Sequence, residues 1–184
     1  MTTIDISQEL STGTWHIDPA HSSVEFVIRH LGLSNVRGRF NSFTGSMTVG
    51  SPQTASSVEM TVDLGSVDTN NADRDNHLRS TDIFNVENHP RMTFRSTAVT
   101  PAGDDYVLTG ELSIAGTTRV VDFALEFGGV AVDAFGAIRS GFSASAEISR
   151  KDFGVEFNIP LEAGGVLLGD KIQIELEIQA VPSG

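Results

Sequence analysis

Apolar and polar residues alternate with a period of two along most of this chain. In the run 171–179, every even position is Ile or Leu and every odd position is Lys, Gln or Glu. Successive side chains of a strand point to opposite faces, so this run predicts a β-strand with one apolar and one polar face. Similar alternation occurs at residues 24–30, 58–64, 106–112, 121–127 and 142–148.

Short segments rich in glycine, proline and aspartate separate these runs, as turns between strands do. They are Gly50–Pro52, Pro101–Asp105, Ala115–Thr117, Gly128–Gly129 and Gly164–Gly165. The pattern therefore predicts about eight to ten antiparallel strands, arranged as a sandwich or a barrel.

The choice between sandwich and barrel depends on what fills the interior. A sandwich core is filled by its own side chains, whereas a barrel of about eight strands can also hold one small ligand. The number of strands and the small inward residues Gly110, Ala144 and Ala146 favour a barrel with an open interior. The same small residues would also fit a tapered interior or a close approach of two sheets, and that alternative stays open.

One segment departs from the alternation and predicts a short helix near residues 71–80. Asn70 or Asn71 can cap its first turn, because a short polar side chain accepts from the free amides there. Asp75 and Arg79 are spaced as i,i+4 partners on this helix.

Composition limits the possible classes of function. The 184 residues fit one domain, residues 13–184, preceded by a flexible tail at residues 1–12. The absence of cysteine excludes disulfides and zinc–thiolate sites. The net charge of −12 argues against nucleic acid and anionic membranes as partners. Eleven Phe residues against one Trp and one Tyr indicate a dry interior.

Residues 1–14 contain neither a basic segment nor an apolar run. No stretch of the chain approaches 18 consecutive apolar residues. We therefore expect no signal peptide, no stable membrane insertion and a cytoplasmic protein.

Several segments resemble, in their order and spacing, the YceI-like or polyisoprenoid-binding family. They are Ile17–Ser22, Val36–Phe40, Arg74–Phe84, Gly110–Gly116, Arg150–Gly154 and Gly169–Asp170. The resemblance covers about Trp15 to Val181, although Ile83 and His89 stand where the family often has aromatic residues. It implies an extended, lipocalin-like, eight-stranded antiparallel barrel that binds a long isoprenoid or similar amphiphile in its interior.

A polyprenyl chain offers no hydrogen bonds, so its affinity must come from buried apolar area, about 0.8 kcal/mol per methylene-sized group. We predict that inward apolar residues line a tunnel for this chain, with ordinary core packing as the alternative for each. The predicted lining is Phe26, Ile28, Met60, Val62, Met92, Phe94, Leu108, Phe123, Leu125, Phe142 and Ile174.

A lipid head group would need polar partners, and four side chains are candidates: His21, His30, Arg74 and His77. His30 falls on the apolar face of its strand, where it can donate to a quinone oxygen or a phosphate. Arg74 can bind a phosphate through two N–H groups and shares a helix face with His77. For each of the four, a hydrogen bond to backbone or to a carboxylate is the structural alternative.

These observations predict a carrier or storage protein for an isoprenoid lipid, such as a polyprenyl phosphate or a prenylated quinone, and not an enzyme. The bound lipid is the expected ligand, with no other cofactor and no metal, and a homodimer stays open. The sequence contains no hydrolase, zinc-protease or nucleotide-binding motif. A His-dependent enzyme for an apolar substrate, with or without a metal, and a protein-binding module are the alternatives.

Overall fold

The computed structural model describes residues 10–162, 164–165 and 167–183, and most of them lie in antiparallel strands. The described residues form one α-helix, α1 (Ala72–Arg79), and four short 3-10 helices, η1 (Pro19–His21), η2 (Gln53–Ala55), η3 (Leu64–Ser66) and η4 (Arg150–Phe153). The strands are β1 (Gly13–Ile17), β2 (Ser23–His30), β3 (Ser34–Phe40), β4 (Phe43–Val49), β5 (Ser57–Asp63), β6 (Val67–Asp68), β7 (Arg91–Ala102), β8 (Asp105–Ile114), β9 (Thr117–Val132), β10 (Ile138–Ser149) and β11 (Leu168–Pro182).

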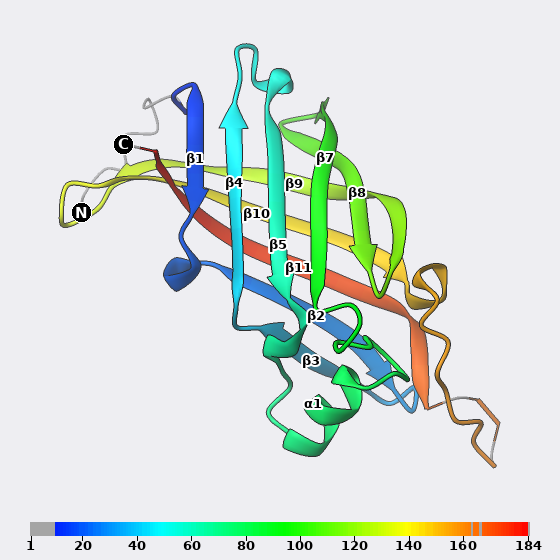
Figure 1. The fold of residues 1–184 in the computed structure, drawn as a ribbon. Coiled ribbons are helices and arrows are strands. Elements are labelled where there is room, and N and C mark those ends of the chain that lie inside the picture. The colour runs from blue at the N-terminus through cyan, green and yellow to red at the C-terminus, as the bar shows by residue number, and fades with distance from the viewer. Residues whose placement is uncertain (1–9, 163, 166, 184) are drawn as a thin grey trace.

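Eight of these strands close into a barrel in the order β1-β4-β5-β7-β8-β9-β10-β11. The closure is the pairing of β1 with the end of β11, where Trp15 lies opposite Pro182 and Ile17 opposite Ala180. The long strands β9, β10 and β11 run diagonally behind the upright strands β4, β5 and β7 (Figure 1). The predicted all-β fold, an eight-stranded antiparallel barrel with one short helix, is confirmed.

Strand β11 divides one of its edges between two partners. Residues 168–177 pair with β2, whereas residues 180–182 pair with β1. The sheet therefore continues from β11 through β2 and β3 to β6, outside the closed barrel. Helix α1 follows β6 and lies beside this extension, at the lower end of the molecule in Figure 1.

Helix α1 is held by the chain that precedes it. The Asn71 side chain caps it, with Oδ1 accepting from the Arg74 amide at 2.9 Å. The predicted Asp75–Arg79 pair is wrong. Asp75 is buried and accepts from the amide and hydroxyl of Thr69 at 2.8 and 2.6 Å, while Arg79 donates to backbone carbonyls of the segment before the helix. Both side chains are used to attach α1 to that segment.

The barrel core divides into two clusters of buried apolar residues. The larger one includes interior residues of the barrel, such as Met60 and Leu108, and extends to Leu64, Val67 and Phe153. The smaller one lies at the β1–β11 closure and consists of Trp15, Met47, Val49 and Ala180, with Leu10 packed against it. Of the predicted flexible tail, residues 1–9 lie outside the described residues, and Leu10 contributes to this cluster.

Gly110 does not leave the room that its small size suggested. A Cβ atom at Gly110 would lie 2.5 Å from Phe94 Cζ and 2.5 Å from the Arg95 carbonyl oxygen. The Phe94 ring therefore covers Gly110, and this glycine makes space for a neighbouring side chain.

Candidate ligand-binding cavity

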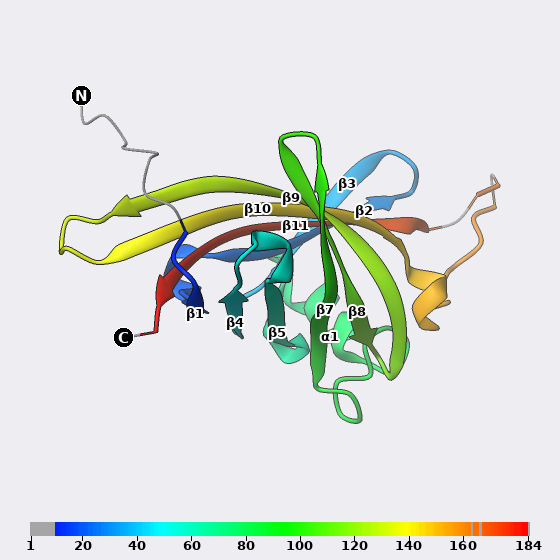
Figure 2. The same cartoon turned by 90° about the horizontal axis from the view of Figure 1, so that it is seen from above.

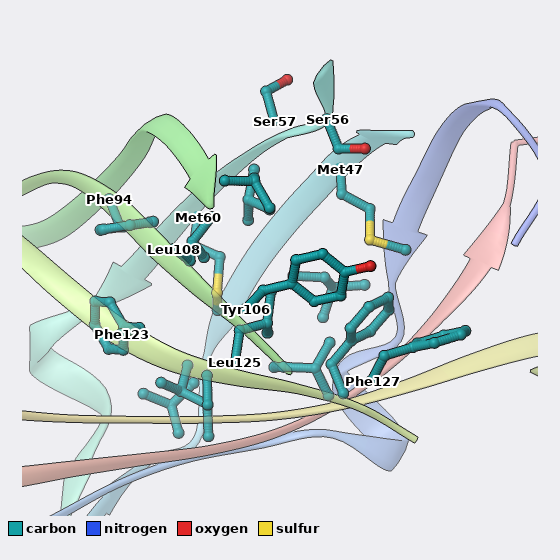
Figure 3. Close-up of a pocket in the computed structure, with 18 of the residues that line it drawn as sticks. Met47, Ser56, Ser57, Met60, Phe94, Tyr106, Leu108, Phe123, Leu125 and Phe127 are labelled. Atoms are coloured by element: carbon teal, nitrogen blue, oxygen red, sulfur yellow. The ribbon is translucent and has the colours of Figure 1, made fainter. Parts of the chain in front are cut away.

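The barrel interior contains a cavity of about 150 Å³. Apolar side chains form nearly all of its lining, and they come from β1, β2, β4, β5 and β7 to β11 (Figure 3). Nine of the eleven residues predicted to line a tunnel lie in this lining: Met60, Val62, Met92, Phe94, Leu108, Phe123, Leu125, Phe142 and Ile174.

Phe26 and Ile28 are the two predicted tunnel residues that do not line the cavity. Strand β2 contributes Val24 to the lining and then continues into the extension of the sheet. The Phe26 ring lies 5.5 Å from that of Phe40, which lies 6.0 Å from that of Phe84. Phe26 therefore belongs to an aromatic cluster beside the cavity.

Several lining residues were not among those predicted. Leu112, Phe127, Leu176 and Ile178 occupy the same alternating faces as the predicted ones, so the period of two was a sufficient signal for them. The polar lining residues from η2 to the start of β5 carry no such signal, because their position depends on where the turn between β4 and β5 reaches the barrel. They include Gln53, Ser56 and Ser57.

The cavity reaches the surface at the end of the barrel beside η2. Gln53 and Ser57 belong to the lining and are exposed to solvent. Across this opening, the Tyr106 hydroxyl donates a hydrogen bond of 2.8 Å to Gln53 Oε1. Phe127 and Phe142 also belong to the lining, and their ring centroids lie 5.2 Å apart.

The inner part of the cavity is closed by aromatic and aliphatic packing. The rings of Phe94 and Phe123 meet edge to face, with centroids 5.1 Å apart. The larger core cluster continues to the fully buried Leu64 in η3 and Val67 in β6. The lining extends from η2 to Val62 and Met92, which lie where β5 ends and β7 begins.

The polar groups of the lining are all uncharged. Among the described residues that form it, none is Asp, Glu, Lys, Arg or His. Hydroxyl and amide groups near the opening, such as Tyr106 and Gln53, can donate and accept hydrogen bonds, but they cannot neutralise an ionic group. The cavity is chemically suited to an apolar chain that ends in an uncharged polar group.

The chain also matches a known protein family. The model of the YceI-like domain matches residues 15–180. This chain belongs to the YceI-like family. The predicted resemblance is therefore confirmed, and the match covers nearly all of the closed barrel.

Relatives of known sequence and structure agree with this assignment. A UPF0312 protein of Pseudomonas aeruginosa is 43% identical over 140 residues, which cover 76% of this chain and 73% of that protein. The structure of BcnA from Burkholderia cenocepacia is similar at a TM-score of 0.79 and 24% identity, covering 90% of this chain and 99% of that one. A polyisoprenoid-binding domain from Saccharophagus degradans is similar at a TM-score of 0.71 and 15% identity, covering 92% and 98%. At these identities the two structures show a shared fold.

None of the four predicted head-group residues lines the cavity of this YceI-like chain. His30 lies half-buried at the end of β2, opposite Ser34. Arg74 donates to the hydroxyl and the carbonyl of Thr69, each at 2.7 Å. In the absence of a cavity contact, their roles in binding a head group stay predictions.

The other two candidates, His21 and His77, are each paired with a carboxylate. His77 Nε2 lies 3.0 Å from Asp82, and its ring meets Phe157 edge to face at 4.7 Å. His21 Nδ1 lies 2.8 Å from Asp18 Oδ2. These contacts match the structural alternative considered for both residues.

Asp18 also joins the Ile17–Ser22 segment to β10. Arg139 Nη1 donates to Asp18 Oδ2 at 2.6 Å, and Arg139 Nε donates to Asp133 at 2.8 Å. The hydrogen bond from Arg139, followed by that from His21, lowers the pKa of Asp18 to about 2. The Ile17–Ser22 segment, which resembles the family, thus connects the closure of the barrel to the β9–β10 hairpin.

Arg150, in another segment that resembles the family, is a buried cation with a structural role. Its guanidinium donates to the carbonyls of Val155, Phe157 and Gly169 at 3.0, 2.7 and 2.8 Å. Burial lowers the pKa of Arg150, and nearby Asp170 opposes this effect. The side chain positions the segment between β10 and β11.

Two further observations concern membrane spans and metals. No helix in the described part of the chain has the length and apolar character needed to cross a bilayer. In that same part, no three His, Asp or Glu side chains are grouped as metal ligands would be.

Proposed function

We propose that this protein binds an isoprenoid or a similar apolar lipid inside the barrel and carries or stores it without transforming it. The observation that carries this proposal is the cavity beside η2, which is lined by apolar side chains and opens to the surface at one end. Burial of apolar area is the main source of affinity for such a ligand, since its chain offers no hydrogen bonds.

The size of the cavity indicates how much of the ligand it holds without rearrangement. An apolar cavity of about 150 Å³ in another protein accommodates a benzene molecule. The empty space here therefore matches roughly one isoprene unit, which contributes about 4 kcal/mol of gross burial energy for five carbons. Association itself costs about 4 to 15 kcal/mol, so useful binding needs three or four units.

Methionine side chains provide a way to admit the additional units. Met47, Met60 and Met92 all line the cavity. Their unbranched thioether side chains can change rotamer at low cost, unlike the β-branched residues around them. We propose that a longer chain enters by displacing these methionine side chains.

The same lining favours an uncharged head group over a phosphate. Tyr106 and Gln53 bond to each other across the opening and can exchange that bond for one to an alcohol or a quinone oxygen. A buried phosphate would need a cation, and the described lining provides none. We therefore propose a prenyl alcohol, a prenylated quinone or a lipid of similar polarity as the ligand.

The fold of the Saccharophagus degradans domain supports this proposal. That domain is a polyisoprenoid-binding domain, and it shares the architecture that encloses the cavity here. Because the identity is only 15%, the support rests on the common barrel and not on shared ligand contacts.

A cavity-filling variant tests the proposal. Ala144 lines the cavity, and Ala144→Phe would occupy much of the empty space, whereas Ala131→Phe places the same ring on an exposed position of β9. Protein purified from its cells should yield an isoprenoid on solvent extraction and mass spectrometry, and Ala131→Phe should do the same. Ala144→Phe should lose the lipid while keeping the far-UV spectrum of the barrel. Equal lipid content in all three proteins, or uptake of no long-chain isoprenoid by the wild type, would contradict the proposal.

A further inference from the structure

The tip of the β9–β10 hairpin, residues 132–138, exposes apolar side chains far from the barrel core. Phe135 is 96% exposed, Val132 55% and Ile138 42%. Figures 1 and 2 both show this hairpin extending past β1 and away from the barrel. Exposed apolar side chains gathered on a projecting loop indicate a surface that meets an apolar partner.

The backbone of the tip is fixed by one carboxylate. Asp133 Oδ1 accepts from the amides of Phe135 and Ala137 at 2.8 and 3.0 Å. The Asp133 amide donates to the Ala137 carbonyl at 2.9 Å, which closes the turn. These bonds fix the backbone at Phe135, and none of them involves its aromatic ring.

The tip carries one charged residue, and that residue is paired. Asp133 is the one charged residue in the segment 127–138, and its Oδ2 accepts from Arg139 Nε at 2.8 Å. The hydrogen bond from Arg139 and those from two backbone amides lower the pKa of Asp133, so it stays ionised and paired. Arg139 is in turn bonded to Asp18, so one guanidinium pairs with two carboxylates at the base of the tip.

A row of cross-strand pairs, buried in its middle, leads from this tip to the cavity lining. Across the hairpin, Ile138 pairs with Val132, Ser140 with Val130, and Phe142 with Phe127. Alternate residues of a strand share a face, so these three pairs lie on the same side of the hairpin. Phe127 and Phe142 line the cavity, Ser140 and Val130 are buried, and Val132 and Ile138 are exposed at the tip.

We propose that the β9–β10 tip docks reversibly on an uncharged lipid bilayer, with Phe135 inserted between the lipids. A bilayer matches the tip in charge, because the tip brings an apolar ring and an internally paired ion pair to the surface. It also matches the protein as a whole, since a net charge of −12 opposes an anionic surface but not a zwitterionic one. This docking goes beyond the proposed ligand binding, and it would place at the membrane the hairpin that contributes Phe127 and Phe142 to the cavity lining.

Flotation with phosphatidylcholine vesicles tests this proposal. The wild type should float with the vesicles, and Phe135→Asp should weaken its apparent affinity by roughly tenfold or more, the value for transferring one Phe side chain. Val120→Asp is the matched control, because Val120 is 69% exposed on β9 outside the tip. Val120→Asp should float as the wild type does. Failure of the wild type to float, or undiminished flotation of Phe135→Asp, would overturn the proposal.

A second measurement separates the bilayer from other occupants of the tip. In the variant F135W, the added indole should shift its emission to the blue with vesicles and be quenched by brominated phosphatidylcholine, while buried Trp15 should not respond. Sedimentation should give the same mass for wild type and Phe135→Asp, since a tip that joins two copies would change mass and overturn the proposal. The cavity variant Ala144→Phe should still float, so docking and ligand binding can fail independently.

Discussion

The Tyr106 hydroxyl, on β8, donates to Gln53 Oε1, on η2, at 2.8 Å across the opening of the barrel cavity. Both residues belong to the cavity lining, and the bond joins elements that the sequence places 53 positions apart. The Tyr106 hydroxyl and the Gln53 amide are therefore polar groups available to a head group at the opening.

Removal of the Tyr106 hydroxyl should discriminate between ligands. Tyr106→Phe keeps the ring in the lining, so we expect the affinity for a prenyl alcohol to fall by roughly five- to tenfold, as for one lost hydrogen bond of about 1 kcal/mol. The affinity for a hydrocarbon of the same length, such as squalene, should stay within about twofold. Titrations with both ligands check this, and equal losses for the two would exclude Tyr106 as a head-group contact.

Substitutions of two leucines should distinguish residues that only stabilise the fold from residues that also bind the ligand. Leu64 is fully buried outside the cavity, so Leu64→Ala should lower the free energy of unfolding by about 2 to 5 kcal/mol without changing ligand affinity. Leu125 lines the cavity and is half-buried, so Leu125→Ala should cost less stability but weaken isoprenoid binding severalfold. Urea unfolding and ligand titration of both variants provide the test, which fails if both respond alike.

Arg150 should be essential to the stability of the fold. Arg150→Ala leaves three backbone carbonyls without their donors, at about 1 to 3 kcal/mol for each unsatisfied buried group, so we expect a loss of about 3 kcal/mol or more. The exposed neighbour provides the control: Lys151→Ala should change stability by less than about 0.5 kcal/mol. Urea unfolding measures both losses. Faster proteolysis between Val155 and Gly169 in Arg150→Ala would show that the loss begins in this segment.

The barrel should lose stability in acid through Asp18. Its pKa is lowered from 3.8 to about 2 in the folded protein, so folding favours the ionised carboxylate. The stabilisation is present above pH 3.8 and is lost as the pH falls from there toward 2. Asp18→Asn and Arg139→Met should both flatten the stability curve in this interval. Unfolding curves from pH 5 to pH 2 check this, and a wild-type slope in both variants would contradict it.

The positions of the strands and of most lining residues could be predicted from the chain. A period of two requires only that one face of each strand be buried, and Ile172, Ile174, Leu176 and Ile178 satisfy this whatever their neighbours. The Asp75–Arg79 pair could not be judged in the same way. Their spacing allows contact, but Thr69 and the carbonyls before α1 compete for both side chains, and this competition exists only in the folded chain.

The alternating sequence by itself determined an antiparallel β-protein with apolar inward faces, because the alternation of side chains is a local property of the strand. Tertiary structure alone decided where the interior is hollow. Phe94 covers Gly110, whereas Ala144 leaves space, although both small residues follow the same pattern. The difference arises from the register of β7, β8 and β10, which determines the side chain that each small residue meets, and register depends on pairing between segments distant in sequence.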